Sequence, residues 1–476
     1  MKLKYLSTAI ILATFPTTVV FAAALDRSGQ SMAAFLQPDN YFEAGISVLD
    51  PTVKGQEAGS STTQRKIGDM GDDYYFPSAA LKLQLTDKVS FGLLYDQPFG
   101  ADAKYSGNNI FVSNPSSDAV LSAPTIDGII TKQATAALEE QNIPINEQSL
   151  AAAKEQVKNS AEFKQLNGAL TAANGYLGTG DTQVKVDTQN LSFVFGFQPN
   201  QNFNFYAGPV IQMIKGNVSL RGQAYSIYNG YDAKIKETTG VGWLAGVAYQ
   251  IPEIALKASL TYRSEIDHDT HFHEDLSLLG FPGLGSILEG LGVSEDKIQA
   301  LNSSGKTTIT TPQSVNLDFQ TGIMANTIAF ANVRWVNWKD FAIQPYQFGK
   351  VSEAVGGLIN RPNGFNLVQY SDDQWSANVG VGRKLNDQWA GNISVGWDSG
   401  AGNPVTTLGP TEGYWNVGLG LQYSPTPATF IAGGVKYFWL GDAKAQSGAD
   451  AGTNNYIAEF EDNHAIAYGL KLGYRF

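Results

Sequence analysis

The chain contains no cysteine, and this absence excludes disulfide bonds and thiolate chemistry. It suits a protein that crosses an oxidising periplasm in an unfolded state. Charged residues are also scarce, at 16% of 476 residues, and the formal net charge is -12. Because binding of nucleic acid needs a basic patch, this balance argues against nucleic acid as a partner. With 43% hydrophobic residues, the chain is predicted to fold rather than to stay disordered.

Long hydrophobic runs are missing beyond the amino terminus. Residues 1–24 have the three parts of a signal peptide: two lysines, an apolar stretch at 5–21, and the small residues Ala22-Ala23-Ala24 for cleavage. Cleavage after Ala22 and cleavage after Ala24 fit equally well. No later run of 18 or more apolar residues could span a bilayer as a helix. A secreted soluble protein or a membrane β-barrel remains.

The carboxy-terminal stretch, residues 464–476, alternates strictly. Its even positions are apolar or aromatic, and the positions between them are small or charged; the former are Ile466, Tyr468, Leu470, Leu472, Tyr474 and Phe476. A period of two places the two sets on opposite faces of a β-strand. Outer-membrane barrels end in such a strand, with lipid on the apolar face and a polar lumen on the other. A half-buried edge strand of a soluble sheet would alternate in the same way.

Further runs of period two recur, and tight turns alternate with long loops between them. Together with 41–50 and 464–476 they make fourteen; the others are 78–85, 89–97, 182–197, 203–225, 241–250, 254–270, 314–324, 328–341, 375–385, 389–398, 414–423 and 429–440. Bacterial barrels have an even number of strands. Several runs exceed the ~5–6 residues of a globular strand and are long enough to cross a bilayer at a tilt. The sequence therefore predicts an all-β fold: a transmembrane antiparallel β-barrel of about 14 strands over residues 41–476, after a short hatch at 25–40.

Two long connections interrupt the pattern, at residues 106–181 and 271–313. In the first, the sequence predicts helices over 126–141, 147–159 and 161–174, which indicates a solvated extracellular cap. The second is unusually apolar for an outward loop, and its apolar candidates for substrate contact are Phe281, Leu284, Ile287, Leu288 and Leu291. These side chains either pack on their own barrel or form an apolar surface that captures a substrate.

Several motifs resemble the FadL family of outer-membrane long-chain fatty acid transporters. They are Gly242-Trp243-Leu244-Ala245-Gly246-Val247, Leu260-Thr261-Tyr262-Arg263-Ser264-Glu265, Thr311-Pro312-Gln313, Ala331-Asn332-Val333-Arg334-Trp335-Val336-Asn337-Trp338, Asp387-Gln388-Trp389, Trp397-Asp398 and Tyr414-Trp415. The likeness covers most of 41–476 outside the two long loops. The resemblance implies a monomeric, non-enzymatic barrel in the outer membrane, in contact with lipid and lipopolysaccharide. It also implies passive uptake of long-chain fatty acids or other hydrophobic molecules, with no cofactor.

In such a transporter, substrate passes from extracellular loops to an apolar lumenal pocket and leaves sideways through a gap in the wall. The family's hatch carries an Asn-Pro-Ala motif, which this chain lacks before Tyr41, and the segment here is shorter. The resemblance places a head-group ligand within a residue of Arg221. A buried carboxylate needs a cation or several donors, so Lys215 is a second candidate, and Met213 shares its strand face. The alternative is a lumenal salt-bridge network, for which Arg263 and Glu265 are the better candidates.

Three of the four histidines fall within residues 267–275. On an extended strand one face would carry Asp267, Asp269, His271, His273 and Asp275, a geometry that could hold a divalent metal. A solvated rim is the plainer interpretation, and no metal site is predicted. Motifs for catalysis are missing: the sequence has no Gly-x-Ser-x-Gly, His-Glu-x-x-His, P-loop or dinucleotide fingerprint.

Hydrophobic uptake is therefore the leading functional hypothesis, with long-chain fatty acids as the substrate. An aromatic-hydrocarbon channel and a water-filled general porin are the alternatives within transport. From other classes, a surface adhesin built on the helical cap and an outer-membrane hydrolase with scattered catalytic residues stay open.

Overall fold

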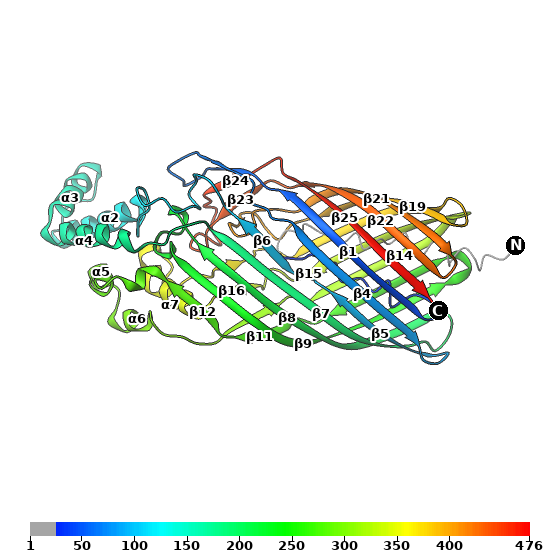
Figure 1. Ribbon diagram of the computed structural model, residues 1–476. Coiled ribbons are helices and arrows are strands. Elements are labelled where there is room, and N and C mark those ends of the chain that lie inside the picture. The colour runs from blue at the N-terminus through cyan, green and yellow to red at the C-terminus, as the bar shows by residue number, and fades with distance from the viewer. Residues whose placement is uncertain (1–24) are drawn as a thin grey trace.

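The computed structural model describes residues 25–476, so the signal-peptide prediction for residues 1–24 lies outside the described residues. Figure 1 shows a long barrel with helices gathered at one end and the carboxyl terminus at the other. These are called the helical end and the turn end below, because the tight turns lie with the carboxyl terminus. Within residues 25–476, no helix is long and apolar enough to cross a membrane.

Fourteen antiparallel strands form the barrel wall, which confirms the predicted fold class. They are β1 (Tyr41–Thr52), β4 (Tyr74–Gln84), β5 (Val89–Asp96), β7 (Gln183–Phe197), β8 (Phe203–Leu220), β9 (Tyr231–Ile251), β10 (Leu256–Arg263), β14 (Ser314–Met324), β15 (Thr327–Val336), β18 (Gln374–Lys384), β19 (Trp389–Asp398), β21 (Tyr414–Thr426), β22 (Thr429–Leu440) and β25 (His464–Arg475). The last strand pairs with the first, from Tyr41 opposite Arg475 to Thr52 opposite His464. Two strands lengthen the wall at the helical end: β6 (Gly100–Lys104) on β7, and β12 (Phe272–Leu276) on β9.

The remaining elements lie in the connections. The helices are α2 (Ala123–Glu140), α3 (Glu147–Asn159), α4 (Ala161–Ala173), α5 (Leu284–Gly290), α6 (Glu295–Ala300) and α7 (Tyr346–Val355), with short 3-10 turns at Asn174–Tyr176, Gln223–Tyr228, Pro252–Ile254, Ser277–Gly280 and Gly356–Ile359. The short strands are β2 (Gly55–Glu57), β3 (Lys66–Ile67), β11 (Ile266–Thr270), β13 (Thr307–Thr311), β16 (Ala342–Ile343), β17 (Val368–Gln369), β20 (Val405–Thr406), β23 (Ala443–Gln446) and β24 (Ala458–Phe460). The three helices predicted in 106–181 are confirmed, and Ser122, Asn146 and Ser160 cap them.

The facing of the strands changes along their length. In the turn-end half the outward side chains are apolar and exposed, as at Phe197, Phe205 and Trp243. In the helical-end half of β7 and β8 the outward side chains are polar, as at Lys185 and Lys215, and the inward ones are apolar. A wall that leaves the lipid and enters water must change its outer face in this way. The prediction of an apolar outside and a polar inside is therefore confirmed only for the turn-end half.

Residues 25–40 lie inside the barrel as a hatch. Met32 and Phe35 are fully buried in an apolar cluster that includes the wall residue Tyr206. The rings of Phe35 and Tyr206 meet edge to face, with centroids 5.6 Å apart. The wall makes room with glycine, since a Cβ on Gly92 would lie 2.4 Å from a Phe35 ring carbon. The hatch thus fills the lumen by side-chain packing rather than by secondary structure of its own.

Candidate functional site

The helical end encloses an outer cavity of ≈ 610 Å³. Its wall combines apolar side chains, such as Tyr225, Tyr228 and Phe348, with a hydroxyl-rich rim that includes Ser60 and Ser447. The rings of Tyr228 and Phe348 stack with centroids 4.2 Å apart, and the Tyr228 hydroxyl donates to the Phe348 carbonyl at 2.8 Å. Burial raises the pKa of Tyr228 well above its usual value, so this phenol stays neutral. The cavity therefore offers apolar surface to a molecule that arrives from water.

A middle cavity of ≈ 70 Å³ lies between the outer cavity and the hatch. It shares Leu367 and Leu408 with the outer cavity, so the two are adjacent. The inward apolar face of β7, β8 and β9 in their helical-end half forms one side of its wall, through Val184, Val186, Val218, Ala233 and Ile235. The change of facing described above thus creates an apolar chamber inside the barrel.

Arg27 of the hatch lines this apolar chamber. Its side chain is 4% exposed, and its guanidinium carbon lies 5.0 Å from the centroid of the Tyr74 ring. Its Nη1 also donates to the Asp26 carbonyl at 3.1 Å. Arg27 lines both the middle cavity and a third cavity, the inner cavity, which lies toward the turn end. A fixed positive charge therefore stands at the junction of the two chambers.

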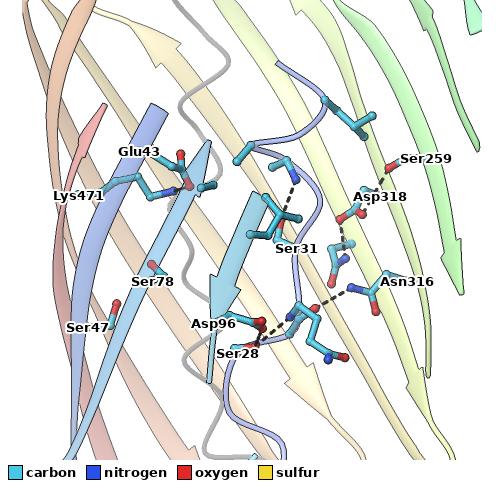
Figure 2. Close-up of a pocket in the computed structure, with 18 of the residues that line it drawn as sticks. Ser28, Ser31, Glu43, Ser47, Ser78, Asp96, Ser259, Asn316, Asp318 and Lys471 are labelled. Atoms are coloured by element: carbon cyan, nitrogen blue, oxygen red, sulfur yellow. Dashed lines mark hydrogen bonds and ion pairs between the residues drawn. The ribbon is translucent and has the colours of Figure 1, made fainter. Parts of the chain in front are cut away.

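An inner cavity of ≈ 180 Å³ lies beside the hatch (Figure 2). Its lining is more polar than that of the middle cavity. The hydroxyl of Ser28 donates to Asp96 at 2.5 Å, and Lys471 pairs with Glu43 at 2.8 Å. Asn332 donates to Asp318 at 2.7 Å. Residues of the hatch line the inner cavity together with these wall residues, so the position of the hatch determines the shape of the cavity.

The barrel wall is interrupted beside this cavity. β4 and β5 stay in register from Gln84 opposite Ser90 to Ala79 opposite Tyr95. Beyond that pair β5 ends, and the chain resumes as β6 on the far side of a short break at residues 97–99. β6 is in register with β7, and a bridge between Ala103 and Gly71 and two backbone hydrogen bonds link it to residues 70–72, just before β4. The ladder between β4 and its neighbour is therefore open over several residues of the described chain.

Two prolines mark the opening. Pro98 lies in the break between β5 and β6, and Pro77 lies on the facing part of β4. Neither can donate a backbone hydrogen bond, so each favours an open ladder over a closed one. The inner cavity reaches the opening, because Pro77, Ser78 and Gln97 line it. This gap in the strand pairing, called the opening below, therefore lies beside the inner cavity at the level of the hatch.

A buried ion pair holds the hatch. Arg334 Nε donates to Asp26 at 2.7 Å, and the two side chains are 3% and 2% exposed. The same guanidinium donates to Gln30 at 3.0 Å and to Asn316 at 2.7 Å. Asn316 in turn donates to the Gly29 carbonyl at 2.6 Å. β14 and β15 thus anchor the hatch on the side of the barrel away from the opening.

The structure does not bring the predicted head-group ligands to these cavities. Arg221 follows β8 and forms a two-pronged ion pair with Asp232, at 2.9 and 2.8 Å, so it ties the β8–β9 loop together. Lys215 is exposed on the outward face of β8, and Met213 lies half-buried on that same face. The side chains of Lys215 and Met213 point away from the lumen because the buried residues of β8 alternate with them. A lysine is tolerated on the outer face here because this part of the wall lies beyond the apolar band.

The apolar loop residues of 271–313 pack within the cap. Leu284, Ile287 and Leu288 are buried in the core of the helical end, and Phe281 and Leu291 pack against it. Helix α5, which carries most of them, contacts α4. These side chains therefore pack on the protein itself and do not form an apolar capture surface.

The predicted pair of Arg263 and Glu265 is wrong, because β10 ends at Arg263 and the facing shifts before β11. Glu265 is exposed, whereas Arg263 is buried and donates to the Gln30 carbonyl of the hatch at 3.2 Å. The histidine-rich stretch is split in a similar way. His268 is buried and hydrogen-bonds Gln212 at 2.8 Å. Within residues 25–476, no group of three potential metal ligands gathers.

Sequence reasoning missed the main lining of the cavities. Arg27 and Leu25 precede the first strand, where no periodicity assigns a facing, and only the fold brings them to the middle cavity. The side opening left one signal in the sequence: Pro98 follows directly after the predicted strand 89–97. β6 beyond it was not predicted.

Comparison with known proteins agrees with this architecture. Residues 142–476 match the family model described as outer membrane protein transport protein (OMPP1/FadL/TodX). The structure is similar to a Pseudomonas aeruginosa FadL homologue at 15% identity, with a TM-score of 0.61 over 98% of this chain and 96% of that chain. It is also similar to the toluene transporters TodX of P. putida and TbuX of Ralstonia pickettii. Each is 11% identical, with a TM-score of 0.53 over 98% of this chain and 99% of the other.

At these identities the likeness to solved structures is a likeness of fold. A comparison with curated protein sequences finds no match. The family model, in contrast, spans most of the chain. The protein therefore belongs to the OMPP1/FadL/TodX family of outer-membrane transport proteins, and it is a non-enzymatic β-barrel channel for hydrophobic compounds.

Proposed function

We propose that this protein carries long-chain fatty acids across the outer membrane by passive diffusion. Substrate enters the outer cavity, moves to the middle cavity, and passes Arg27 into the inner cavity. The shared lining residues support this order: Leu367 and Leu408 join the first two cavities, and Arg27 joins the last two. The protein acts as a monomer, because the pairing of β1 with β25 closes the barrel within one chain.

The observation that carries the choice of substrate is Arg27. A carboxylate cannot enter an apolar chamber without a cation or several donors, because an unpaired buried charge is costly. Arg27 supplies a fixed cation where the apolar middle cavity ends. The acyl chain lies among Val186, Val218 and Ile235, and the head group meets the guanidinium. A neutral hydrocarbon cannot form a charge-assisted hydrogen bond with this guanidinium.

Release occurs sideways, through the opening between β4 and β5. An acyl chain that leaves here enters the hydrocarbon core directly and avoids the cost of exposing apolar surface to water. Phe76, Pro77 and Ser78 line the way from the inner cavity to the wall. The exposed ring of Tyr75 lies on the outer side of the same strand. The outward polar band around Lys185 and Lys215 faces the lipopolysaccharide head groups at a higher level.

Uptake of monoaromatic hydrocarbons is a second candidate. The middle cavity is small, at ≈ 70 Å³, and such a volume suits a ring better than an extended chain. Two structures with this fold are those of toluene transporters. Under this alternative Arg27 is a structural residue that stacks on Tyr74.

Uptake of radiolabelled oleate and of toluene separates the two. Cells that lack their own fatty acid transporter are compared with and without this protein. The proposal expects oleate uptake to rise with the protein. If oleate uptake is unchanged while toluene uptake rises, the fatty acid assignment is wrong. Uptake of hydrophilic solutes in the same cells tests the general porin, since a plugged lumen should not admit them.

A further inference from the structure

The first described residue, Leu25, is part of the middle cavity wall. Its carbonyl oxygen accepts a hydrogen bond from the Gly100 backbone N–H at 2.8 Å. Asp26 forms a bridge with Phe99, and the Arg27 N–H donates to the Pro98 carbonyl at 2.6 Å. Three consecutive residues are thus tied to the break in the wall. The backbone nitrogen of Leu25 belongs to the same residue as the first of these anchored groups, the Leu25 carbonyl.

In the sequence, Ala22 and Ala24 stand three residues and one residue before the Ala24–Leu25 bond. Small residues at these two positions are what signal peptidase requires. We propose that cleavage at this bond turns the nitrogen of Leu25 into an α-ammonium group of the middle cavity, which binds the anionic head group of an amphiphile together with Arg27. This inference rests on the proposed function, because it needs an anionic substrate.

The nearby acids are engaged elsewhere. The Asp26 carboxylate pairs with Arg334 at 2.7 Å, and Asp102, which also lines the cavity, pairs with Lys185. The other charged group on the cavity wall is Arg27 itself. An ammonium group at Leu25 would therefore need an anion to complete its coordination. A ligand head group supplies one.

The proposal predicts a pH dependence that Arg27 alone cannot give. An α-amino group loses its proton near pH 8, whereas a guanidinium stays charged. Burial raises the pKa of Tyr370, a phenol of the cavity wall, above its ordinary value, so it stays neutral over this range. Glu412, which acts on Tyr370 and whose pKa burial raises to about 7, gains its charge at the lower end of the range, and the insertion variant described below separates its effect from that of the ammonium. Asp102 forms an ion pair with Lys185. Affinity for an anion should therefore fall between pH 7 and pH 9.5, and affinity for an uncharged analogue should not.

The test uses the processed full-length protein in lipid nanodiscs. Hexadecanesulfonate is the probe because it stays anionic over the whole range, and hexadecanol is the uncharged control. Mass spectrometry of the amino-terminal peptide first establishes the cleavage site. We expect Leu25 at the terminus and a loss of about tenfold in sulfonate affinity from pH 7 to 9.5, as one charge-assisted hydrogen bond would give.

An insertion variant separates the ammonium from general effects of pH. Insertion of Gly-Ser between Ala24 and Leu25 moves the charge by up to ~7 Å. The same dipeptide inserted after Asn142, in the exposed α2–α3 connection, is the control. The first insertion should lower sulfonate affinity at pH 7 about as much as pH 9.5 does in the parent protein, and the control should not.

Three results would overturn the inference: cleavage at another bond, a pH-independent sulfonate affinity, or equal behaviour of the two insertions. A failure of the proposed function looks different. In that case the parent protein would show no preference for hexadecanesulfonate over hexadecanol at pH 7 at all. A preference that survives both pH 9.5 and the insertion leaves Arg27 as the head-group ligand and removes the ammonium.

Discussion

The backbone N–H of Arg27 donates to the carbonyl oxygen of Pro98 at 2.6 Å. This bond joins the start of the hatch to the break in the barrel wall. The Arg27 side chain lines the middle and inner cavities, so one residue contacts the substrate chamber, the hatch and the opening. A substrate that displaces the backbone of Arg27 would also break its bond to Pro98. Under the proposed function, this short segment would then link substrate binding to the opening.

The hatch should leave the lumen when its ion pair is broken. Arg334→Ala leaves Asp26 buried and unpaired, which typically costs about 3–5 kcal/mol. The hatch has no secondary structure to resist this loss, so we expect the variant to conduct ions in a planar bilayer where the parent protein conducts almost none. Lys350→Ala removes an exposed ion pair with Glu353 and should change nothing. Unchanged conductance of Arg334→Ala would mean that packing around Phe35 seals the lumen by itself.

Two arginines should differ in their effect on head-group selectivity. Arg27→Ala should weaken oleate binding about tenfold more than binding of oleyl alcohol, because one charged hydrogen bond is lost. Arg221→Ala should affect both ligands equally, since Arg221 binds Asp232 outside the cavities. The two variants are compared by equilibrium binding with purified protein. Equal losses for both ligands in Arg27→Ala would remove Arg27 from the head-group site.

Much of the wall could be predicted because alternation and turn chemistry are local. The closing strand followed from its period of two, and its pairing with β1 followed from the closure of the predicted barrel. The facing of Lys215 could not be predicted, since it depends on where the lipid ends, and the strand pattern continues past that level without a break. The sequence pattern predicts that the polar face around Lys215 lines the lumen, whereas in the structure that face is exposed on the outside.

The substrate path was less accessible to sequence reasoning. Arg27 gains its place from contacts with Pro98 and Tyr74, which are distant in the sequence. The hatch has no period that would show which side chains are buried. The apolar residues around Leu288 stood out in the sequence, but an apolar loop that packs on α4 looks the same as one that binds a ligand.

The helical insertion should be dispensable for uptake. Ala134, Leu138 and Ala153 form a small core of their own between α2 and α3. The ends of the insertion lie together, because the Val120 N–H donates to Oδ1 of Asn174 at 2.9 Å. Replacement of residues 123–173 by a short Gly-Ser linker should therefore leave a folded barrel that still takes up oleate. Loss of uptake with the barrel intact would give the helices a direct part in transport, and loss of surface attachment alone would favour an adhesin.

One loop carboxyl should make the fold sensitive to pH. Burial raises the pKa of Glu412 to about 7, although the Gly402 backbone N–H, which donates to it at 3.2 Å, acts in the opposite direction. The folded state therefore holds this proton more tightly than the unfolded state does. The resulting stability is full below the ordinary pKa of about 4.5 and is lost as the pH rises through about 7.

Thermal unfolding of the parent protein and of Glu412→Gln checks this at pH 5 and pH 8. The glutamine variant mimics the protonated carboxyl, so it should be the more stable protein at pH 8 and should show the smaller difference between the two values. Equal pH dependence of the two proteins would place the titrating group elsewhere.

The central claim is that substrate leaves through the opening between β4 and β5. Because the chain has no cysteine, Ser78→Cys introduces a single thiol beside that opening, and Ser424→Cys near a turn serves as the control. Oleate uptake is measured before and after labelling with benzyl methanethiosulfonate, and again after reduction. The account predicts that labelled Ser78→Cys falls to the uptake of cells without the protein and recovers on reduction, whereas the control is unaffected. Full labelling of Ser78→Cys with unchanged oleate uptake would contradict it.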